Sequence, residues 1–177
     1  MNSSKVSYLF FTLSIILIFS QSLVPTSCKT LYESVCEDTL NGNNAPCLKL
    51  LKIDPTILSA KNYVDLTNSI LDLAITKATD GQNYISNFNK QNQPPAIQKC
   101  ATTLYPGSIS SFKKAKVELV KDPQTASSDA RLAGDGPSNC ADAIKAAGIN
   151  DAIIIYLNTN VLLLSDIASV AARKLVK

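Results

Sequence analysis

The chain has 177 residues, with 17 basic and 14 acidic side chains and no histidine. Its formal net charge of +3 is too small and too dispersed to favour nucleic acid as a partner. Without histidine, the usual base for a serine or cysteine nucleophile is missing, so no catalytic residue is predicted. Glycine is scarce while alanine, leucine, isoleucine and lysine are plentiful, a composition that favours helices.

Residues 1–22 are predicted to be a secretory signal peptide. A short polar stretch containing Lys5 precedes the apolar run 9–19, and the small serines of residues 20–22 (SQS) suit a signal peptidase. The run is too short to cross a bilayer, which takes about 20 apolar residues. The cut is placed within residues 22–27. Because only Lys5 is lost, the mature chain carries a net charge of +2, and no membrane association is expected for it.

The mature chain, 28–177, is predicted to be one domain made of a hairpin (28–55) and a helical body (56–177). Within the hairpin, Cys36 and Cys47 bracket ten residues dominated by Asn, Asp, Gly and Pro, which is turn chemistry. Two short helices around such a turn bury little surface. A Cys36–Cys47 bridge would supply the missing constraint, worth about 3 kcal/mol in the chain-entropy model.

Four long helices are predicted for the body. Apolar residues at helical spacing run from Ala60 to Phe88, and a second helix follows Pro94-Pro95 and ends near Asp122-Pro123. Pro106 should kink that helix, since proline removes a backbone hydrogen bond and clashes with the preceding turn. A third helix is expected to break at residues 134–137, resume, and end at Gly148.

The last helix begins after Asn150-Asp151, which offers capping chemistry. Asp151, Asn158, Asn160 and Asp166 argue against a membrane span here. Its apolar seam alternates steps of four and three for three heptads, interrupted by one Asn. The seam positions are Ile149, Ile153, Tyr156, Asn160, Leu163, Ile167 and Val170. Long amphipathic helices with short connections and no strand pattern predict an all-α, antiparallel four-helix bundle with an N-terminal helical hairpin.

The five cysteines of a secreted chain suggest two disulfides and one odd thiol. Cys28 is the expected free thiol, although a Cys28–Cys36 pair would instead free Cys47. A Cys100–Cys140 bridge would fasten two bundle helices together and contribute about 4 kcal/mol. No C-x-x-C pair and no histidine are present, so neither a metal site nor a cofactor is predicted.

The joint order of these features resembles the plant invertase and pectin methylesterase inhibitor family. A signal peptide precedes a cysteine-bracketed hairpin with CLKLLKIDP (47–55), and 39 residues separate Cys100 from Cys140 within NCADAI (139–144). The resemblance covers essentially the whole mature chain. It implies small extracellular or vacuolar four-helix bundles with a hairpin, and it assigns the disulfides as Cys36–Cys47 and Cys100–Cys140.

The resemblance also implies a function without chemistry of its own. Members of the family are protein inhibitors that form one-to-one complexes and block the substrate cleft of a carbohydrate-active enzyme. The expected partner is a pectin methylesterase or an acid invertase. The expected location is the apoplast, with the vacuole as the alternative. A homodimer through the hairpin is a further expectation from the family.

The sequence departs from both inhibitor types. Invertase inhibitors carry Pro-Lys-Phe in the inter-helix turn that corresponds to the turn at Asp122 in this chain. Here the motif's place is taken by Pro123-Gln124-Thr125, which lacks the cation and the aromatic ring. Pectin methylesterase inhibitors use broad helix faces, and here Tyr105 is kept while Pro106 interrupts the segment. The preferred target is therefore pectin methylesterase, with Tyr105 and residues 122–125 as candidate contacts.

Two other functions stay open. A noninhibitory relative would have the same stable bundle without effect on either enzyme. A small-ligand carrier would need an apolar cavity, but the eight-cysteine framework of plant lipid-transfer proteins is absent.

Overall fold

The computed structural model describes residues 29–39 and 43–176, so the predicted signal peptide and Cys28 lie outside the described residues. Within those ranges the regular structure is helical and contains no strand. In chain order the elements are α2 (Leu31–Glu37), α3 (Asn44–Leu51), α4 (Pro55–Leu58), α5 (Tyr63–Asn87), α6 (Pro95–Lys99), the π-helical turn η1 (Cys100–Leu104), α7 (Tyr105–Glu118), α8 (Pro123–Leu132), α9 (Asp135–Ala146) and α10 (Ala152–Arg173).

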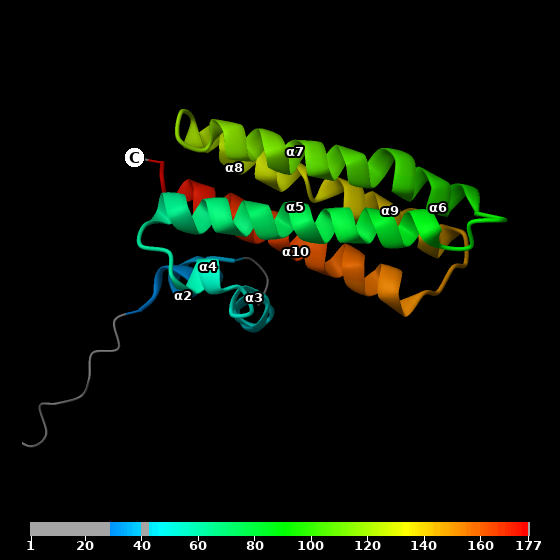
Figure 1. The fold of residues 1–177 in the computed structure, drawn as a ribbon, viewed down its shortest axis with the longest axis horizontal. Coiled ribbons are helices and arrows are strands. Elements are labelled where there is room, and N and C mark those ends of the chain that lie inside the picture. The colour runs from blue at the N-terminus through cyan, green and yellow to red at the C-terminus, as the bar shows by residue number, and fades with distance from the viewer. Residues whose placement is uncertain (1–28, 40–42, 177) are drawn as a thin grey trace, which may run out of the picture.

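Four helical segments form the body, as the sequence predicts. They are α5, the run from α6 through α7, the broken pair α8 and α9, and α10, connected by short turns at alternating ends of the bundle (Figure 1). Each helix buries an apolar or small-residue face that it cannot bury alone, which is why the four associate. The expectation of an all-α bundle with two disulfides is confirmed.

Short polar side chains fix where the long helices begin. The Asn62 side chain accepts a hydrogen bond from the Asp65 amide (2.9 Å) at the start of α5. Asp151 does the same for the Ile154 amide (2.8 Å) at the start of α10, as its capping chemistry predicts. Just after the C-terminal end of α9, Gly148 adopts a positive φ of 65°, a backbone conformation that other residues rarely adopt.

The interruption expected at Pro106 takes the form of a π-helical turn immediately before it. The Tyr105 amide donates to the Cys100 carbonyl, one residue farther back than in an α-helix. Pro106 has no amide hydrogen, so the Ala101 carbonyl loses its partner within the helix. The Gln82 side chain on α5 replaces that partner, with its Nε2 donating to the Ala101 carbonyl oxygen at 3.0 Å.

Gly136 lets α9 approach the π-helical turn closely. A Cβ atom at this position would lie 2.1 Å from the Ser108 Oγ and 2.4 Å from the Leu104 carbonyl oxygen. The predicted break before α9 therefore serves packing, because it brings a residue without a side chain against another backbone. The Cys100–Cys140 disulfide joins the same two elements covalently.

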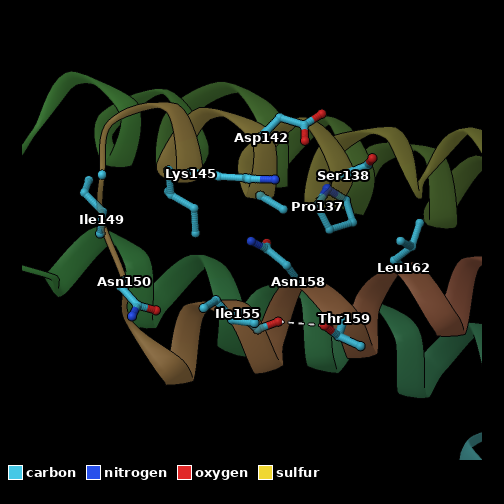
Figure 2. A pocket seen from close by; sticks show the side chains of 13 residues that line it. Pro137, Ser138, Asp142, Lys145, Ile149, Asn150, Ile155, Asn158, Thr159 and Leu162 are labelled. Atoms are coloured by element: carbon cyan, nitrogen blue, oxygen red, sulfur yellow. Dashed lines mark hydrogen bonds between the residues drawn. The ribbon is translucent and has the colours of Figure 1, made fainter.

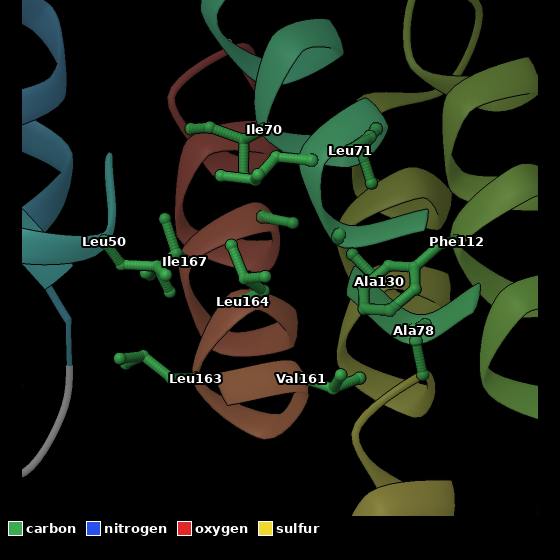
Figure 3. Packing of buried hydrophobic residues seen from close by; sticks show 14 of the residues in the cluster. Leu50, Ile70, Leu71, Ala78, Phe112, Ala130, Val161, Leu163, Leu164 and Ile167 are labelled. Atoms are coloured by element: carbon green, nitrogen blue, oxygen red, sulfur yellow. The ribbon is translucent and has the colours of Figure 1, made fainter. Parts of the chain in front are cut away.

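The hairpin packs on the body rather than extending from it. The disulfide Cys36–Cys47 connects α2 to α3, and Val35 and Leu51 are fully buried. Leu50 of α3 faces Ile167 and Leu163 of α10 (Figure 3). Polar contacts add to this packing: the Tyr63 hydroxyl donates to the Ser34 Oγ at 3.2 Å, and Lys174 forms an ion pair with Asp38.

The seam predicted for α10 is correct only in its second half. Leu163, Ile167 and Val170 are buried, but Ile153 and Tyr156 are 49% and 64% exposed. Toward the start of the helix the core face instead consists of Ile154, Asn158 and Val161. A strict seven-residue repeat drifts by about 20° per heptad around a straight α-helix, so a seam that fits one end points elsewhere at the other.

Among the described residues, α10 is the one helix long and apolar enough to cross a membrane. Its most apolar 18-residue window has a mean hydropathy of 1.6. More than half of that window, 56%, is buried inside the protein. The same composition is expected of the central helix of a bundle, which is the place that α10 occupies beside α5 and α8.

Removing the hairpin disulfide should loosen the hairpin more than the bundle. In a variant carrying Cys36→Ser and Cys47→Ser, the amides of α2 and α3 should exchange with solvent faster, while those of α5 and α10 keep most of their protection. The reason is that the bridge closes a short local loop. Hydrogen exchange read by mass spectrometry checks this, and an equal loss of protection along the whole chain would contradict it.

Candidate functional site

The turn between α7 and α8 presents the candidate contact residues 122–125 at one end of the bundle (Figure 1). Asp122 is the N-cap of α8: its carboxylate accepts from the Thr125 amide at 3.0 Å and from the Thr125 hydroxyl at 2.7 Å. The Asp122 and Thr125 side chains therefore hydrogen-bond each other, and these bonds hold the turn in one conformation before any partner binds.

Pro123 and Gln124 complete the turn in different ways. Pro123 occupies the first position of α8, where a missing amide hydrogen costs nothing, and it is half-buried. The Gln124 side chain is exposed. Of the four candidate residues in the turn, Gln124 is the one whose side chain projects to solvent without a recorded partner among the described residues.

Tyr105 does not belong to this surface, and its assignment as a contact residue is corrected. It is fully buried, and its hydroxyl donates to the Asn158 Oδ1 of α10 at 2.8 Å. Burial raises the pKa of this phenol well above its ordinary value, which keeps the proton in place for that bond. A Cβ atom at Gly81 would touch the Tyr105 ring at 2.6 Å, so α5 covers the ring from another side.

A shallow hollow between α7 and α8 extends the turn into a larger surface. Its volume is about 430 Å³, and it is lined by Ser110, Lys113, Lys114, Val117, Glu118, Thr125 and Asp129. Val117, one of these lining residues, is 65% exposed, and Val120, three residues farther along the chain, is 73% exposed. We call the hollow, the two valines and residues 121–125 the α7–α8 face. Two exposed apolar side chains inside a mixed-charge rim are typical of protein contact surfaces.

Sequence reasoning missed the two valines, although the sequence carries a signal for them. The buried residues of α7 are Tyr105, Ser108, Phe112 and Ala115, and the same helical spacing continues to the buried Leu119 just after the helix. Val117 and Val120 fall outside that stripe, so a helix that buries Phe112 and Ala115 must expose them. An apolar residue that falls outside the core stripe beside a turn is the pattern to look for.

The hydrogen bonds from Thr125 hold the pKa of Asp122 below its ordinary value. A carboxyl whose pKa is lower in the folded state stabilises the fold above its unfolded pKa of about 3.9, and that contribution is lost as the pH falls through the folded value. Asparagine at this position still caps the helix but does not titrate. The melting temperature of the wild type, relative to that of Asp122→Asn, should therefore be highest near pH 6 and decline below about pH 4. A constant difference down to pH 2 would contradict the role of this carboxylate.

The described residues of the α7–α8 face include no cluster of metal ligands. Across the described ranges 29–39 and 43–176, no three His, Cys, Asp or Glu side chains gather so that they could hold a metal ion. The two hairpin cysteines and the two bundle cysteines pair as predicted, which removes these four as nucleophiles or ligands. What the face offers is shape, two apolar side chains and charges of both signs.

Together, the bundle, its packed hairpin and its two disulfides define a class of small, disulfide-linked all-α proteins. The family model described as plant invertase/pectin methylesterase inhibitor matches residues 22–171. The chain belongs to this family. The search of curated proteins found no match.

Two solved structures share the fold. The crystal structure of mutant form A of a pectin methylesterase inhibitor from Arabidopsis superposes with a TM-score of 0.70 at 23% identity, covering 80% of this chain and 95% of that one. The crystal structure of a pectin methylesterase inhibitor from Arabidopsis thaliana gives a TM-score of 0.61, also at 23% identity, covering 82% and 96%. At this identity the likeness establishes the fold.

Proposed function

We propose that the protein is a secreted inhibitor that forms a one-to-one complex with a plant pectin methylesterase and blocks its substrate cleft through the α7–α8 face. Family membership supports an inhibitor, and the absence of histidine supports a protein without catalysis of its own. We choose this face because Val117 and Val120 are exposed beside a turn that the Asp122–Thr125 hydrogen bonds already hold in place.

Pectin methylesterase is preferred over invertase because of what the turn presents. An invertase inhibitor of this family would place a lysine and a phenylalanine where Gln124 and Thr125 stand. Thr125 instead bonds Asp122, and Gln124 offers neither charge nor an aromatic ring. A broad helix face with charges of both signs suits a pectin methylesterase better than an invertase.

The two disulfides are consistent with secretion to the apoplast. Disulfides persist in oxidising compartments, and this bundle carries two. The predicted signal peptide points the same way, with the vacuole as the alternative destination. A homodimer through the hairpin remains a separate expectation, which sedimentation velocity of the purified mature chain would test.

The test of the function is a titration of oxidised mature protein against a plant pectin methylesterase and an acid invertase in parallel, at about pH 5 and pH 7. We expect a saturable loss of esterase activity near one equivalent and no loss of invertase activity. Inhibition of invertase alone would reverse the target. Flat curves for both enzymes, with a protein that circular dichroism shows to be folded, would indicate a noninhibitory relative.

Variants of the α7–α8 face locate the contact. Val117→Glu combined with Val120→Glu should weaken esterase inhibition at least about tenfold, because exposed apolar anchors at an interface carry much of its binding energy. The matched control is Ile153→Glu with Tyr156→Glu, two exposed apolar residues of α10 near the other end of the bundle. Equal inhibition by both double variants and the wild type would place the contact elsewhere.

A further inference from the structure

A second hollow lies between α9 and the first half of α10 (Figure 2). The turn that joins these two helices is at the opposite end of the bundle from the α7–α8 turn (Figure 1). Its volume is about 490 Å³, within the range of small-molecule sites. Ile149, Ile155 and Leu162 supply apolar wall, and Ser138, Lys145 and Thr159 supply polar groups. The surface of the lining is mainly apolar, although six of the thirteen lining residues are polar or charged.

Asn158 forms part of this pocket and has one polar atom without a partner. The side chain is only 3% exposed, and its Oδ1 accepts from the Tyr105 hydroxyl. Its Nδ2 is buried and has no hydrogen-bond partner. Figure 2 shows the amide reaching from α10 toward α9, into the space that the pocket occupies.

An orphaned amide donor is costly in a folded protein. Leaving such a group buried and unpaired costs about 1–3 kcal/mol. The Tyr105 hydroxyl fixes the orientation of the amide, because it already occupies Oδ1 and leaves the NH₂ group toward the pocket. A ligand that brings an acceptor oxygen to Nδ2 recovers this cost, since the donor is held in place before the ligand arrives.

The formal charges at the pocket are one of each sign, and its donors, the Lys145 ammonium and the Asn158 amide, favour a ligand with an acceptor group. Lys145 lines the pocket, and so does Asp142. Figure 2 shows the Asp142 carboxylate pointing away from the Asn158 amide. An ammonium and an amide NH₂ are both donors, and a carboxylate has two oxygens with which to accept from them.

We propose that the α9–α10 pocket binds a small carboxylic acid with an apolar body. The carboxylate accepts from Asn158 Nδ2 at the floor, Lys145 pairs with its charge, and the apolar part covers Ile149, Ile155 and Leu162. This site is separate from the α7–α8 face, so it stands whether or not the protein inhibits an esterase.

The test uses three probes with the same phenylbutyl body and the oxidised mature protein, with isothermal titration calorimetry at pH 7. They are 4-phenylbutyrate, its neutral amide 4-phenylbutanamide, and the cation 4-phenylbutylamine. We expect 4-phenylbutyrate to bind at least about tenfold more tightly than the amine, because a carboxylate can accept from Asn158 and Lys145 whereas an ammonium cannot accept at all. The amide should bind less tightly than the acid. An amide that binds as tightly as the acid would overturn the carboxylate assignment, and no measurable binding of the acid would overturn the site.

Two variants locate the binding. Asn158→Asp keeps an oxygen to accept from Tyr105 but replaces the donor with a second oxygen, so binding of 4-phenylbutyrate should fall at least about tenfold. Because a new buried carboxylate can unfold the chain, Ala141→Phe gives an independent test: Ala141 lines the pocket on α9, and a phenyl ring there fills it.

The matched control for the filled pocket is Ala146→Phe, an exposed position of the same helix that does not line the pocket. We expect Ala141→Phe to abolish binding and Ala146→Phe to leave it unchanged, with the amide resonances of α9 and α10 shifting on titration only where binding persists. Binding that survives Ala141→Phe, or that both phenylalanine variants lose, would overturn the assignment.

Discussion

Replacing Gly136 with alanine should lower the free energy of unfolding by about 2–3 kcal/mol, the upper part of the range for overpacking a core. The new Cβ would lie 2.4 Å from the Leu104 carbonyl oxygen, and a backbone atom cannot rotate away as a side chain can. The helices must separate at this point, which also strains the nearby Cys100–Cys140 link between them. Chemical denaturation of the oxidised protein measures the change.

Gly107 is the matched control for this substitution. It also lies within a helix, but a Cβ there would meet no atom within 4 Å. Gly107→Ala should therefore raise the free energy of unfolding by about 0.5–1 kcal/mol, because alanine loses less backbone entropy on folding. Equal effects of the two substitutions would show that close approach of α9 is not what requires glycine at position 136.

Removing the Cys100–Cys140 disulfide should have the largest effect on stability. The bridge closes a loop of 40 residues, and the chain-entropy model gives about 4 kcal/mol for that constraint. Both cysteines are fully buried, so serines in their place add polar groups to the core. In the variant with Cys100→Ser and Cys140→Ser, the denaturation midpoint should fall cooperatively for the whole bundle.

The hairpin variant with Cys36→Ser and Cys47→Ser serves as the comparison. Its loop is 11 residues long, and its loss should cost about 3 kcal/mol at most, confined largely to α2 and α3. Hydrogen exchange distinguishes the two variants: the bundle variant should lose protection in α5 and α10, and the hairpin variant should not. A bundle variant that keeps the wild-type midpoint would mean that packing alone holds α9 against the π-helical turn.

The sequence alone determined the fold class and most helix boundaries of this protein. Helical periodicity, the caps at Asn150-Asp151, and the glycine and proline breaks depend on local backbone chemistry, which does not need the rest of the chain. The spacing of the cysteines within the hairpin favoured the pairing that the structure contains, and the family resemblance selected it. The inference that Pro106 interrupts its helix came from the same kind of local rule.

Only the tertiary structure decided which faces are buried and what they enclose. Tyr105 looked like a surface contact in the sequence, but its hydroxyl reaches across 53 residues of chain to Asn158 in the core. The seam of α10 left the core at Ile153 and Tyr156 because a strict seven-residue repeat drifts around a straight helix, and only the packed bundle shows which end of that seam stays buried. The α9–α10 pocket depends on how these two helices pack against each other, which the periodicity of neither helix reports.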